Sequence, residues 1–488
     1  MDRKRDQQLQ EYTELLRLKD KVEGELLRIP GVVAVSVGLK VIDGLHTEDM
    51  CLRIYVDEKK PLERIPETYR IPSLIDGVAT DVNEIPKDVT ASAATKPDTA
   101  RYRPLCGGIA IKSANSKRGL IGTLGCMVLD EAEGNVFLLT NHHILRGNGE
   151  EKGHDVGQPD FCCEPCPCRC GEIAKLERWG NLETDNVDCA IAILTSDQQD
   201  NWNNDVLGLG PVRSIRLDDS GTPVHPVLPN DTVFKRGVSS RRTEGLVIDP
   251  AAPVTVPIPT KDGLVSINFT KQILIHPKTS VNKAFVSKGD SGSVVLNHLN
   301  EVIGLHFADN EVRNEDNVVV HRATESYANP IQDVLKILEV SIPETGTLQT
   351  LPIRSGEGYP PPKKDALEEL TKTIESEPDG ALFIETFNKH RQEVSDLILA
   401  DREVKVAWNR YQGPAFVAHL IEKAKDPAHP TPTEIGGVSY RRLLLKMSVV
   451  LEAKGSPELA IDIERYSARA LALIERLIEN EGRIDKGG

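Results

Sequence analysis

Between residues 105 and 340 the chain consists of many short apolar runs that glycine, proline, asparagine and aspartate interrupt. Examples are 122–129, 136–140, 190–194, 264–269 and 302–307. Short runs separated by turn residues are typical of β-strands. Because barrels and sandwiches are built from many such strands, we predict an all-β region, long enough for two small barrels side by side.

The segments before and after this region have different patterns. Residues 1–28 carry apolar side chains at helical spacing, and alternating apolar residues after Ile29-Pro30-Gly31 predict strands. Ser456-Pro457-Glu458 is typical of a helix start, because serine caps the first turn and proline fits within it. We therefore predict a multi-domain chain with an N-terminal α+β domain over 1–90, a linker over 91–104, an all-β double barrel over 105–340, a Pro/Gly linker over 341–364 and an α-helical domain over 365–488.

The charge balance excludes some classes of partner. The formal net charge is −15 at pH 7, so we expect no nucleic acid partner. The first residues are charged and no apolar run reaches membrane-spanning length, which predicts no secretory signal, no membrane contact and a cytoplasmic location. Structural disulfides are rare in that compartment, so the nine cysteines need another role.

Five of these cysteines lie together between Cys162 and Cys170. In a cytosolic chain, such a dense group of cysteines indicates a metal site more readily than a disulfide, and a tetrahedral zinc site needs four ligands. However, the usual second Cys-x-x-Cys pair is missing, and the intervening Pro165 and Pro167 strain a single-loop cage. Structural zinc, redox-reactive thiols and solvent-exposed thiols therefore stay open, while the chemistry predicted below requires no cofactor.

A tight glycine turn, Gly289-Asp290-Ser291-Gly292, precedes the apolar run 294–296. Such a turn exposes one serine hydroxyl and aims backbone N–H groups, here those of Gly289 and Ser291, at a developing oxyanion. Serine is a poor nucleophile until an imidazole takes its proton, and that imidazole needs a buried carboxylate to fix its tautomer. Because these residues also form ordinary turns, the prediction depends on a histidine and an aspartate elsewhere in the chain.

Candidates for both lie upstream, each beside a predicted strand. The run 136–140 leads directly into a histidine pair, and two aspartates precede the run 190–194. The chain order is therefore His, Asp, Ser, which is one of the known serine-protease orders. We favour His143, Asp188 and Ser291, and the alternatives are His142, Asp185 and Ser293, respectively.

With these motifs, residues 105–340 resemble the trypsin-like serine proteases of the chymotrypsin fold. Thr140-Asn141-His142-His143-Ile144 resembles the Thr-Asn-x-His-Val motif of the high-temperature-requirement proteases and glutamyl endopeptidases, in which the second histidine position carries catalysis. The wider layout from about residue 30 to 340, including Thr80-Asp81-Val82 and Asn329-Pro330-Ile331, is similar to intracellular bacterial trypsin-like peptidases and plant narrow-leaf-type proteases. The helical tail carries no motif that we can place.

The resemblance implies a role for each residue. His143 is the general base, Asp188 orients it, and Ser291 is the nucleophile. The oxyanion hole is formed at Gly289, Asp290 and Ser291.

It also implies two substrate-pocket residues. Phe285 stands six positions before Ser291, where an acidic pocket floor would be needed for cleavage after Lys or Arg, so that specificity is not implied. His306 ends a segment that resembles the pocket-wall strand of glutamyl endopeptidases, and it would favour an acidic or amide P1 side chain. A satisfied core histidine is the alternative role for His306.

One feature departs from trypsin, which is activated when a new N-terminus pairs with the aspartate before the serine. Here the predicted barrel begins only at residue 105, and Asp290 has no obvious free amine to meet. We therefore expect constitutive order, or activation by a partner or by an oligomer formed through the N- or C-terminal domain.

Three functions compete. The complete His143, Asp188 and Ser291 set favours a serine endopeptidase that acts on protein or peptide substrates, is selective or gated, and is regulated by its flanking domains. The first alternative is a latent protease-like scaffold or sensor whose helical domain binds a partner. The second is an esterase or another acyl-transfer hydrolase, which the all-β pattern and the residue order disfavour.

Overall fold

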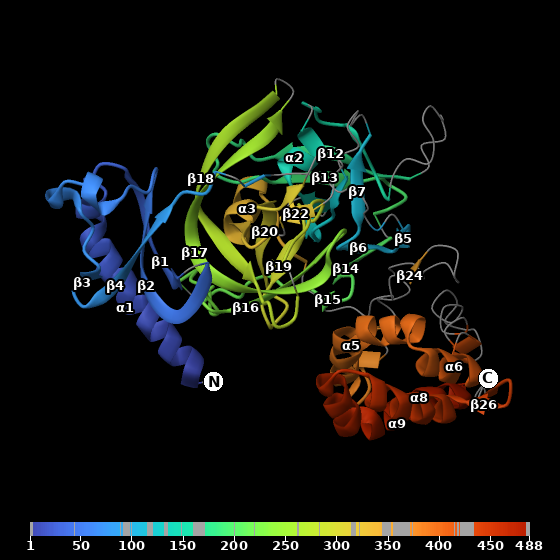
Figure 1. The fold of residues 1–488 in the computed structure, drawn as a ribbon. Coiled ribbons are helices and arrows are strands. Elements are labelled where there is room, and N and C mark those ends of the chain that lie inside the picture. The colour runs from blue at the N-terminus through green and yellow to red at the C-terminus, as the bar shows by residue number, and fades with distance from the viewer. Residues whose placement is uncertain are drawn as a thin grey trace. The chain divides into compact units, whose positions relative to one another are not determined.

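The computed structural model divides into two compact units (Figure 1). Unit 1 contains Met1–Ala100, Gly107–Thr195 and Arg213–Pro343, and unit 2 contains Arg101–Cys106, Ser196–Val212 and Glu344–Gly488. The structure describes residues 3–484 apart from 43, 88, 91–97, 99, 115–120, 131–134, 148, 160–170, 200, 219, 261–262, 283, 314–318, 322, 344–352, 355–370, 373, 414, 417–418 and 420–433.

Unit 1 begins with one helix packed on a four-stranded sheet of order β1-β2-β4-β3. Its elements are α1 (Arg3–Leu26), β1 (Val32–Ile42), β2 (Leu45–Val56), β3 (Leu74–Ile75) and β4 (Val78–Glu84). Leu15 of α1 lies in one apolar cluster with Val37 and Leu52 of the sheet. The helix and strands predicted in this part of the sequence are therefore confirmed.

A seven-stranded sheet follows, of order β8-β7-β11-β12-β13-β10-β9. Its strands are β7 (Ala110–Ser113), β8 (Ile121–Thr123), β9 (Met127–Leu129), β10 (Val136–Thr140), β11 (Asp155–Gly157), β12 (Glu172–Trp179) and β13 (Ala190–Leu194). By its strand pairing this sheet is open, so our expectation of two closed barrels is wrong for the first half. The two end strands, β8 and β9, are consecutive in the chain. Between them the Gly125 amide donates to the Leu139 carbonyl of β10 at 2.8 Å. The sheet therefore curls, although β8 and β9 do not pair with each other.

Six strands close the second half into a barrel of order β16-β17-β18-β23-β20-β19. They are β16 (Thr232–Gly237), β17 (Arg241–Thr260), β18 (Gly263–Pro277), β19 (Val294–Leu296), β20 (Val302–Asp309) and β23 (Ser326–Pro330). The long β17–β18 hairpin dominates this barrel in Figure 1. β21 (Val312–Arg313) pairs with β22 (Val319–His321), and the helix α3 (Ile331–Leu338) packs against β20 and β23. The predicted all-β region thus has one closed barrel and one curled sheet.

A buried polar cluster joins the N-terminal sheet to the barrel within unit 1. Asp249 of β17 accepts hydrogen bonds from Ser36 and from the Tyr55 hydroxyl, the latter at 2.6 Å, and Arg53 Nε lies 3.3 Å from its carboxylate. Buried charges need such partners, because an isolated buried carboxylate is costly. The N-terminal sheet is therefore fixed to the outer side of β17.

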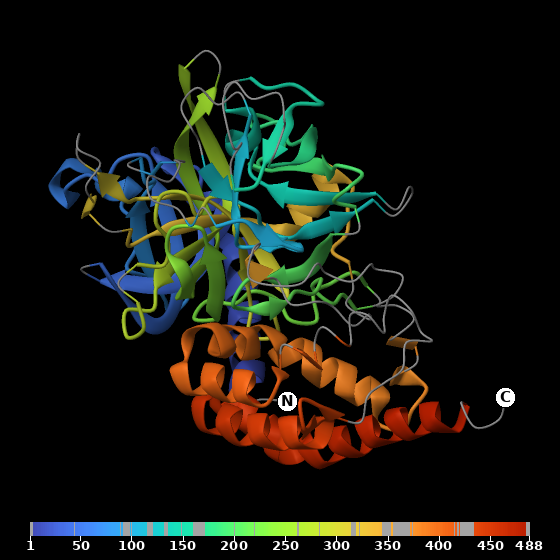
Figure 2. The ribbon, with the colours of Figure 1, turned by 90° about the vertical axis from the view of Figure 1, so that its right-hand side faces the viewer.

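Unit 2 is built on helices. They are α5 (Gly380–Ala400), α6 (Arg402–Arg410), α8 (Tyr440–Lys454) and α9 (Pro457–Ile484), and its short strands are β5 (Tyr102–Arg103), β6 (Leu105–Gly107), β14 (Trp202–Val206), β15 (Gly210–Pro211), β24 (Ile353–Arg354), β25 (Glu434–Ile435) and β26 (Val438–Ser439). Figure 2 shows α8 and α9 side by side. The predicted start of α9 is confirmed, because the Ser456 hydroxyl accepts from the Leu459 amide at 3.1 Å. Within the described ranges, no helix is long and apolar enough to cross a bilayer.

Candidate active site

The structure brings His143 and Asp188 into direct contact. Strand β10 leads into the short helix α2 (His142–Arg146), and Asp188 stands just before β13, which pairs with β10. His143 Nδ1 lies 2.5 Å from Asp188 Oδ2, and the His143 amide donates to Oδ1 at 3.1 Å. A carboxylate only accepts hydrogen bonds, so Nδ1 carries the proton and Nε2 keeps its lone pair. Nε2 of His143 is buried and has no hydrogen-bond partner in the described part of the chain.

Asp188 is held as a charged group although it is 0% exposed. Burial raises its pKa, but the His143 ring and the His143 amide outweigh burial, so the pKa lies below its usual value. Asn141 donates to the Asp188 carbonyl at 2.7 Å, and Asn329 accepts from the Asp188 amide at 3.0 Å. The backbone of Asp188 is therefore fixed on both its carbonyl and its amide side.

The alternative residues are engaged elsewhere. His142 Nδ1 donates to the Gly180 carbonyl at 2.9 Å, and burial lowers the pKa of His142. Asp185 accepts from the Asn181 amide at 2.7 Å in an exposed turn. The Ser293 hydroxyl donates to the Asp290 carbonyl at 2.7 Å and is fully buried. These contacts are structural, so the geometry favours His143, Asp188 and Ser291.

Ser291 follows the glycine turn, and its surroundings place it beside the end of β10. A Cβ on Gly292, whose φ is +93°, would lie 2.2 Å from both the Thr123 carbonyl and the Thr140 hydroxyl, so only glycine fits there. The Ser291 hydroxyl donates to the Phe307 carbonyl at 3.5 Å. In this state it therefore hydrogen-bonds to β20 and not to His143. Ser291 and His143 are only 2% and 1% exposed, so solvent hardly reaches the site.

Two backbone amides of the turn are free to bind an oxyanion. In the described structure, neither the Gly289 nor the Ser291 N–H donates to an acceptor. The Asp290 amide already donates to the Ser287 carbonyl at 3.0 Å. We therefore correct the predicted oxyanion hole, since Asp290 has no free N–H to contribute. Gly289, with φ at +102°, adopts the left-handed conformation that this turn requires.

The side chain of Asp290 meets an amine that sequence reasoning missed. Lys235 Nζ lies 2.6 Å from Asp290 Oδ2, and both side chains are fully buried. The carboxylate also accepts from the amides of Ser239, Ser240 and Ser287 at 2.9–3.1 Å. Our expectation that no amine is available to Asp290 is therefore wrong, because an internal lysine supplies one.

The burial pattern of β16 explains this pair. Val233, Lys235 and Gly237 face inward, so the lysine occupies a core position where a charge needs a partner. Burial lowers the pKa of Lys235, and the nearby Asp290 carboxylate only partly opposes that shift. For Asp290, burial raises the pKa, but the Lys235 ammonium outweighs burial, so the pKa lies below its usual value. A Cβ on Gly237 would lie 2.1 Å from the Asp290 carboxyl carbon, so glycine makes room for the pair.

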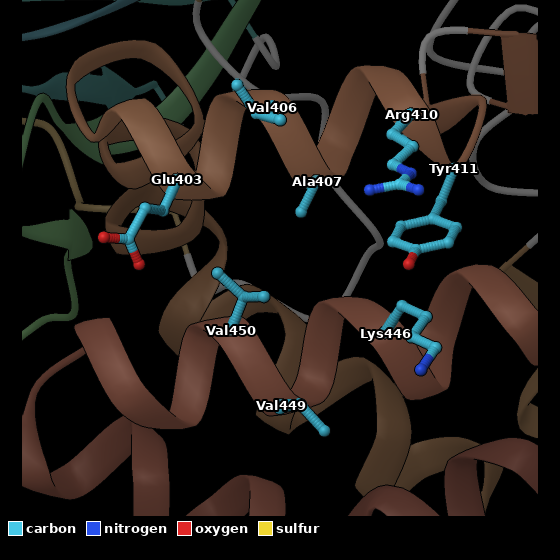
Figure 3. Close-up of a pocket in the computed structure, with 8 residues that line it drawn as sticks. All are labelled: Glu403, Val406, Ala407, Arg410, Tyr411, Lys446, Val449 and Val450. Atoms are coloured by element: carbon cyan, nitrogen blue, oxygen red, sulfur yellow. The ribbon is translucent and has the colours of Figure 1, made fainter.

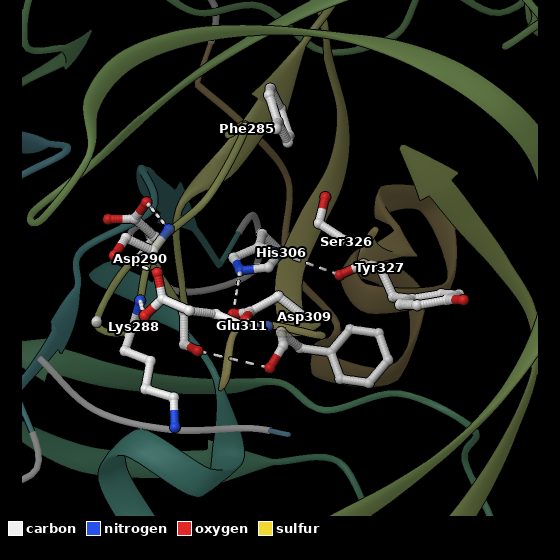
Figure 4. Close-up of polar contacts among 12 residues, drawn as sticks. Phe285, Lys288, Asp290, His306, Asp309, Glu311, Ser326 and Tyr327 are labelled. Carbon is white, nitrogen blue, oxygen red and sulfur yellow. Dashed lines mark hydrogen bonds and ion pairs between the residues drawn. The ribbon is translucent and has the colours of Figure 1, made fainter. Parts of the chain in front are cut away.

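The two predicted pocket residues differ in their surroundings (Figure 4). Phe285 is 1% exposed and packs in the apolar core of the barrel, together with Val233 and Val295. It is therefore a core residue in this structure. His306 lies on β20, and its amide donates to the carbonyl of Ser293, two residues beyond Ser291, at 2.9 Å.

His306 is a neutral hydrogen-bond acceptor. Its Nδ1 donates to the Tyr327 carbonyl at 3.2 Å, and burial lowers its pKa to about 3. Among the described residues its Nε2 has no hydrogen-bond partner, and Oδ2 of Asp309 lies 4.0 Å from it. Burial raises the pKa of Asp309 to about 7, and no lysine or arginine pairs with it among the described residues.

Two further features lie away from this site. The cysteine loop from Cys162 to Cys170, with its zinc hypothesis, falls outside the described residues. In unit 2 a pocket of about 450 Å³ lies between α6 and α8 (Figure 3). Apolar side chains such as Val406 and Val449 line it, with Arg410 and Lys446 near one end.

Comparisons with known proteins give similarity in structure only. No protein-family model matches this chain, and no curated protein does either. A Nocardiopsis protease is 14% identical, with a TM-score of 0.32 over 49% of this chain and 98% of its own. A glutamic-acid-specific serine protease, which uses a histidine triad in substrate binding, is 17% identical, with a TM-score of 0.30 over 49% and 100% of the two chains. The chymotrypsin of Cellulomonas bogoriensis is 15% identical, with a TM-score of 0.31 over 49% and 98%. These scores are low, so the chemistry below rests on the contacts of this chain.

Proposed function

We propose that this chain is a serine endopeptidase that hydrolyses peptide bonds through an acyl-enzyme intermediate. The observation that carries the proposal is the buried pair of His143 and Asp188, which fixes the imidazole with Nε2 as its free nitrogen. The two unpaired amides of Gly289 and Ser291 add a ready oxyanion site on the neighbouring turn.

The proposed reaction begins when the Ser291 hydroxyl leaves the Phe307 carbonyl and turns to His143. Nε2 then takes the hydroxyl proton as Oγ attacks the scissile carbonyl, and Asp188 stabilises the resulting imidazolium. The Gly289 and Ser291 amides bind the oxyanion, and each such donor is worth about 3–4 kcal/mol in related sites. His143 next protonates the leaving amine, and water, deprotonated by His143, hydrolyses the acyl ester.

The contacts of His306 bear on the P1 side chain. A neutral imidazole that already donates through Nδ1 offers only the Nε2 lone pair, and Asp309 lies beside it. Such a site accepts hydrogen bonds and does not attract a carboxylate. Between the acidic and amide P1 side chains expected from the sequence, we propose the amide.

Labelling with a fluorophosphonate tests the proposed function. We expect the wild-type chain to form an adduct on Ser291, located by mass spectrometry, and His143→Ala to lose it. His142→Ala is the matched control, because that ring bonds to the Gly180 carbonyl and takes no part in the proposed proton transfer. Equal labelling of wild type and His143→Ala would show that His143 is not the base.

A further inference from the structure

The edge of β20 beside Ser291 is only partly covered by the barrel. β23 pairs with β20 from Gly304 to Asp309, whereas β19 on the other side pairs only from Val302 to Leu305. Beyond β19, the His306 amide and carbonyl pair with Ser293 and Gly292, at 2.9 Å each. Residues 307–309 therefore extend past β19 and offer backbone groups to another strand.

The nucleophile lies at the start of this extension. The Ser291 hydroxyl contacts the Phe307 carbonyl at 3.5 Å, and the free amides of Gly289 and Ser291 belong to the same turn. An extended peptide gains backbone hydrogen bonds when it adds to an open strand edge. A peptide that paired with residues 307–309 would therefore pass beside Ser291.

The chain itself already fills the far end of this edge. The Thr90 amide donates to the Asp309 carbonyl at 2.8 Å, and the Asp309 amide donates to the Thr90 carbonyl at 3.2 Å, in an antiparallel bridge. Val89 is fully buried in the apolar cluster that contains Phe307 and Ala308. At Thr90 the chain runs antiparallel to β20.

We propose that Thr90 competes, from within the same chain, with an extended peptide substrate for the backbone edge of residues 307–309. The inference rests on the proposed function. Because the competitor is tethered, it raises the apparent KM for every peptide substrate and leaves kcat unchanged.

Replacing Thr90 with proline tests this competition. Thr90→Pro removes the N–H that donates to Asp309, whereas Thr90→Ala keeps it and is the matched control. With a library of quenched fluorescent octapeptides as substrate, we expect Thr90→Pro to lower KM about tenfold, which corresponds to about 1.4 kcal/mol, at constant kcat. Thr90→Ala should behave like wild type. An unchanged KM in Thr90→Pro would overturn the competition.

Hydrogen exchange separates this inference from the proposed function. In peptic fragments that contain Asp309, we expect slow amide exchange in the wild type and Thr90→Ala, and about tenfold faster exchange in Thr90→Pro. If exchange follows this pattern but no variant cleaves peptides, Thr90 does occupy the edge, and both the proposed endopeptidase activity and the proposed competition are wrong. Equal exchange in all three chains would show that Thr90 does not protect the edge.

Discussion

The buried ion pair behind the serine turn predicts a large effect for Lys235→Met. This change leaves the Asp290 carboxylate, which is 0% exposed, without its cation. Removing one partner of a buried ion pair typically costs about 3–5 kcal/mol. Because three backbone amides and the Ser240 hydroxyl still donate to the carboxylate, we expect the lower end, about 3 kcal/mol, in the free energy of unfolding of unit 1.

Urea unfolding measures this loss in unit 1 alone when the probe is chosen accordingly. The chain has three tryptophans, and only Trp179 lies in unit 1. In a Trp202→Phe, Trp408→Phe background, its fluorescence therefore follows the curled sheet and not the helical unit. The double variant Lys235→Met, Asp290→Asn is the control, because removing both charges avoids the uncompensated carboxylate.

The expected pattern is a large loss of stability in the single variant and recovery of most of it in the double variant. Labelling of Ser291 by a fluorophosphonate should be slower in both, since the turn loses the pair that anchors it. A single variant that matches the wild type within about 1 kcal/mol would refute the reasoning, as would a double variant no more stable than the single.

Three further predictions follow from the same region. Burial raises the pKa of Asp309 from 3.8 to about 7, so between these values the folded chain keeps a proton on this carboxyl that the unfolded chain loses. The free energy of unfolding should therefore fall as the pH rises from about 4 to 7. Urea titrations across that range should show a weaker fall in Asp309→Asn. Gly237→Ala places a Cβ 2.1 Å from the Asp290 carboxyl carbon, so thermal unfolding should show a loss of more than about 2 kcal/mol, and an unchanged midpoint would contradict the tight packing. Since His306 accepts hydrogen bonds, matched peptides should be cleaved faster with glutamine than with glutamate at P1, and the reverse order in kcat/KM would show that a cation or donor faces the substrate.

The residues proposed for catalysis could be chosen from the sequence, because each stands at a recognisable junction between a strand and a turn. His143 follows β10, Asp188 precedes β13, and Ser291 lies in a glycine turn before β19. Strand pairing then brings β10 and β13 together, which an alternation of short apolar runs cannot specify. The contact of His143 with Asp188 is therefore a finding of the structure.

The partner of Asp290 was missed because a lysine inside a short strand normally indicates a solvated face. In a strand, Lys235 lies on the same face as Val233, two positions before it, and this shared face is the signal that the sequence offers. Phe285 was assigned from a count of positions before Ser291, and the side chain packs in the barrel core. Counting along the chain does not determine which way a side chain points when the loop between is irregular.

The bridge between Thr90 and Asp309 joins residues more than two hundred positions apart, so no local pattern indicates it. The segment before it reads as the end of a small domain, and the Ala, Thr and Pro that follow read as a linker. Non-local pairing of this kind depends on the finished barrel, which leaves β20 longer than β19.

The most direct test of the central claim is the chemistry of the acyl-enzyme. The purified chain is mixed with a p-nitrophenyl ester, the released nitrophenol is followed in the first seconds, and the acid-quenched protein is mapped by mass spectrometry. We predict a burst of one nitrophenol per chain with the acyl group on Ser291, and no burst from Ser291→Ala. An acyl group on another residue, or a full burst from Ser291→Ala, would contradict the assignment of Ser291 as the nucleophile.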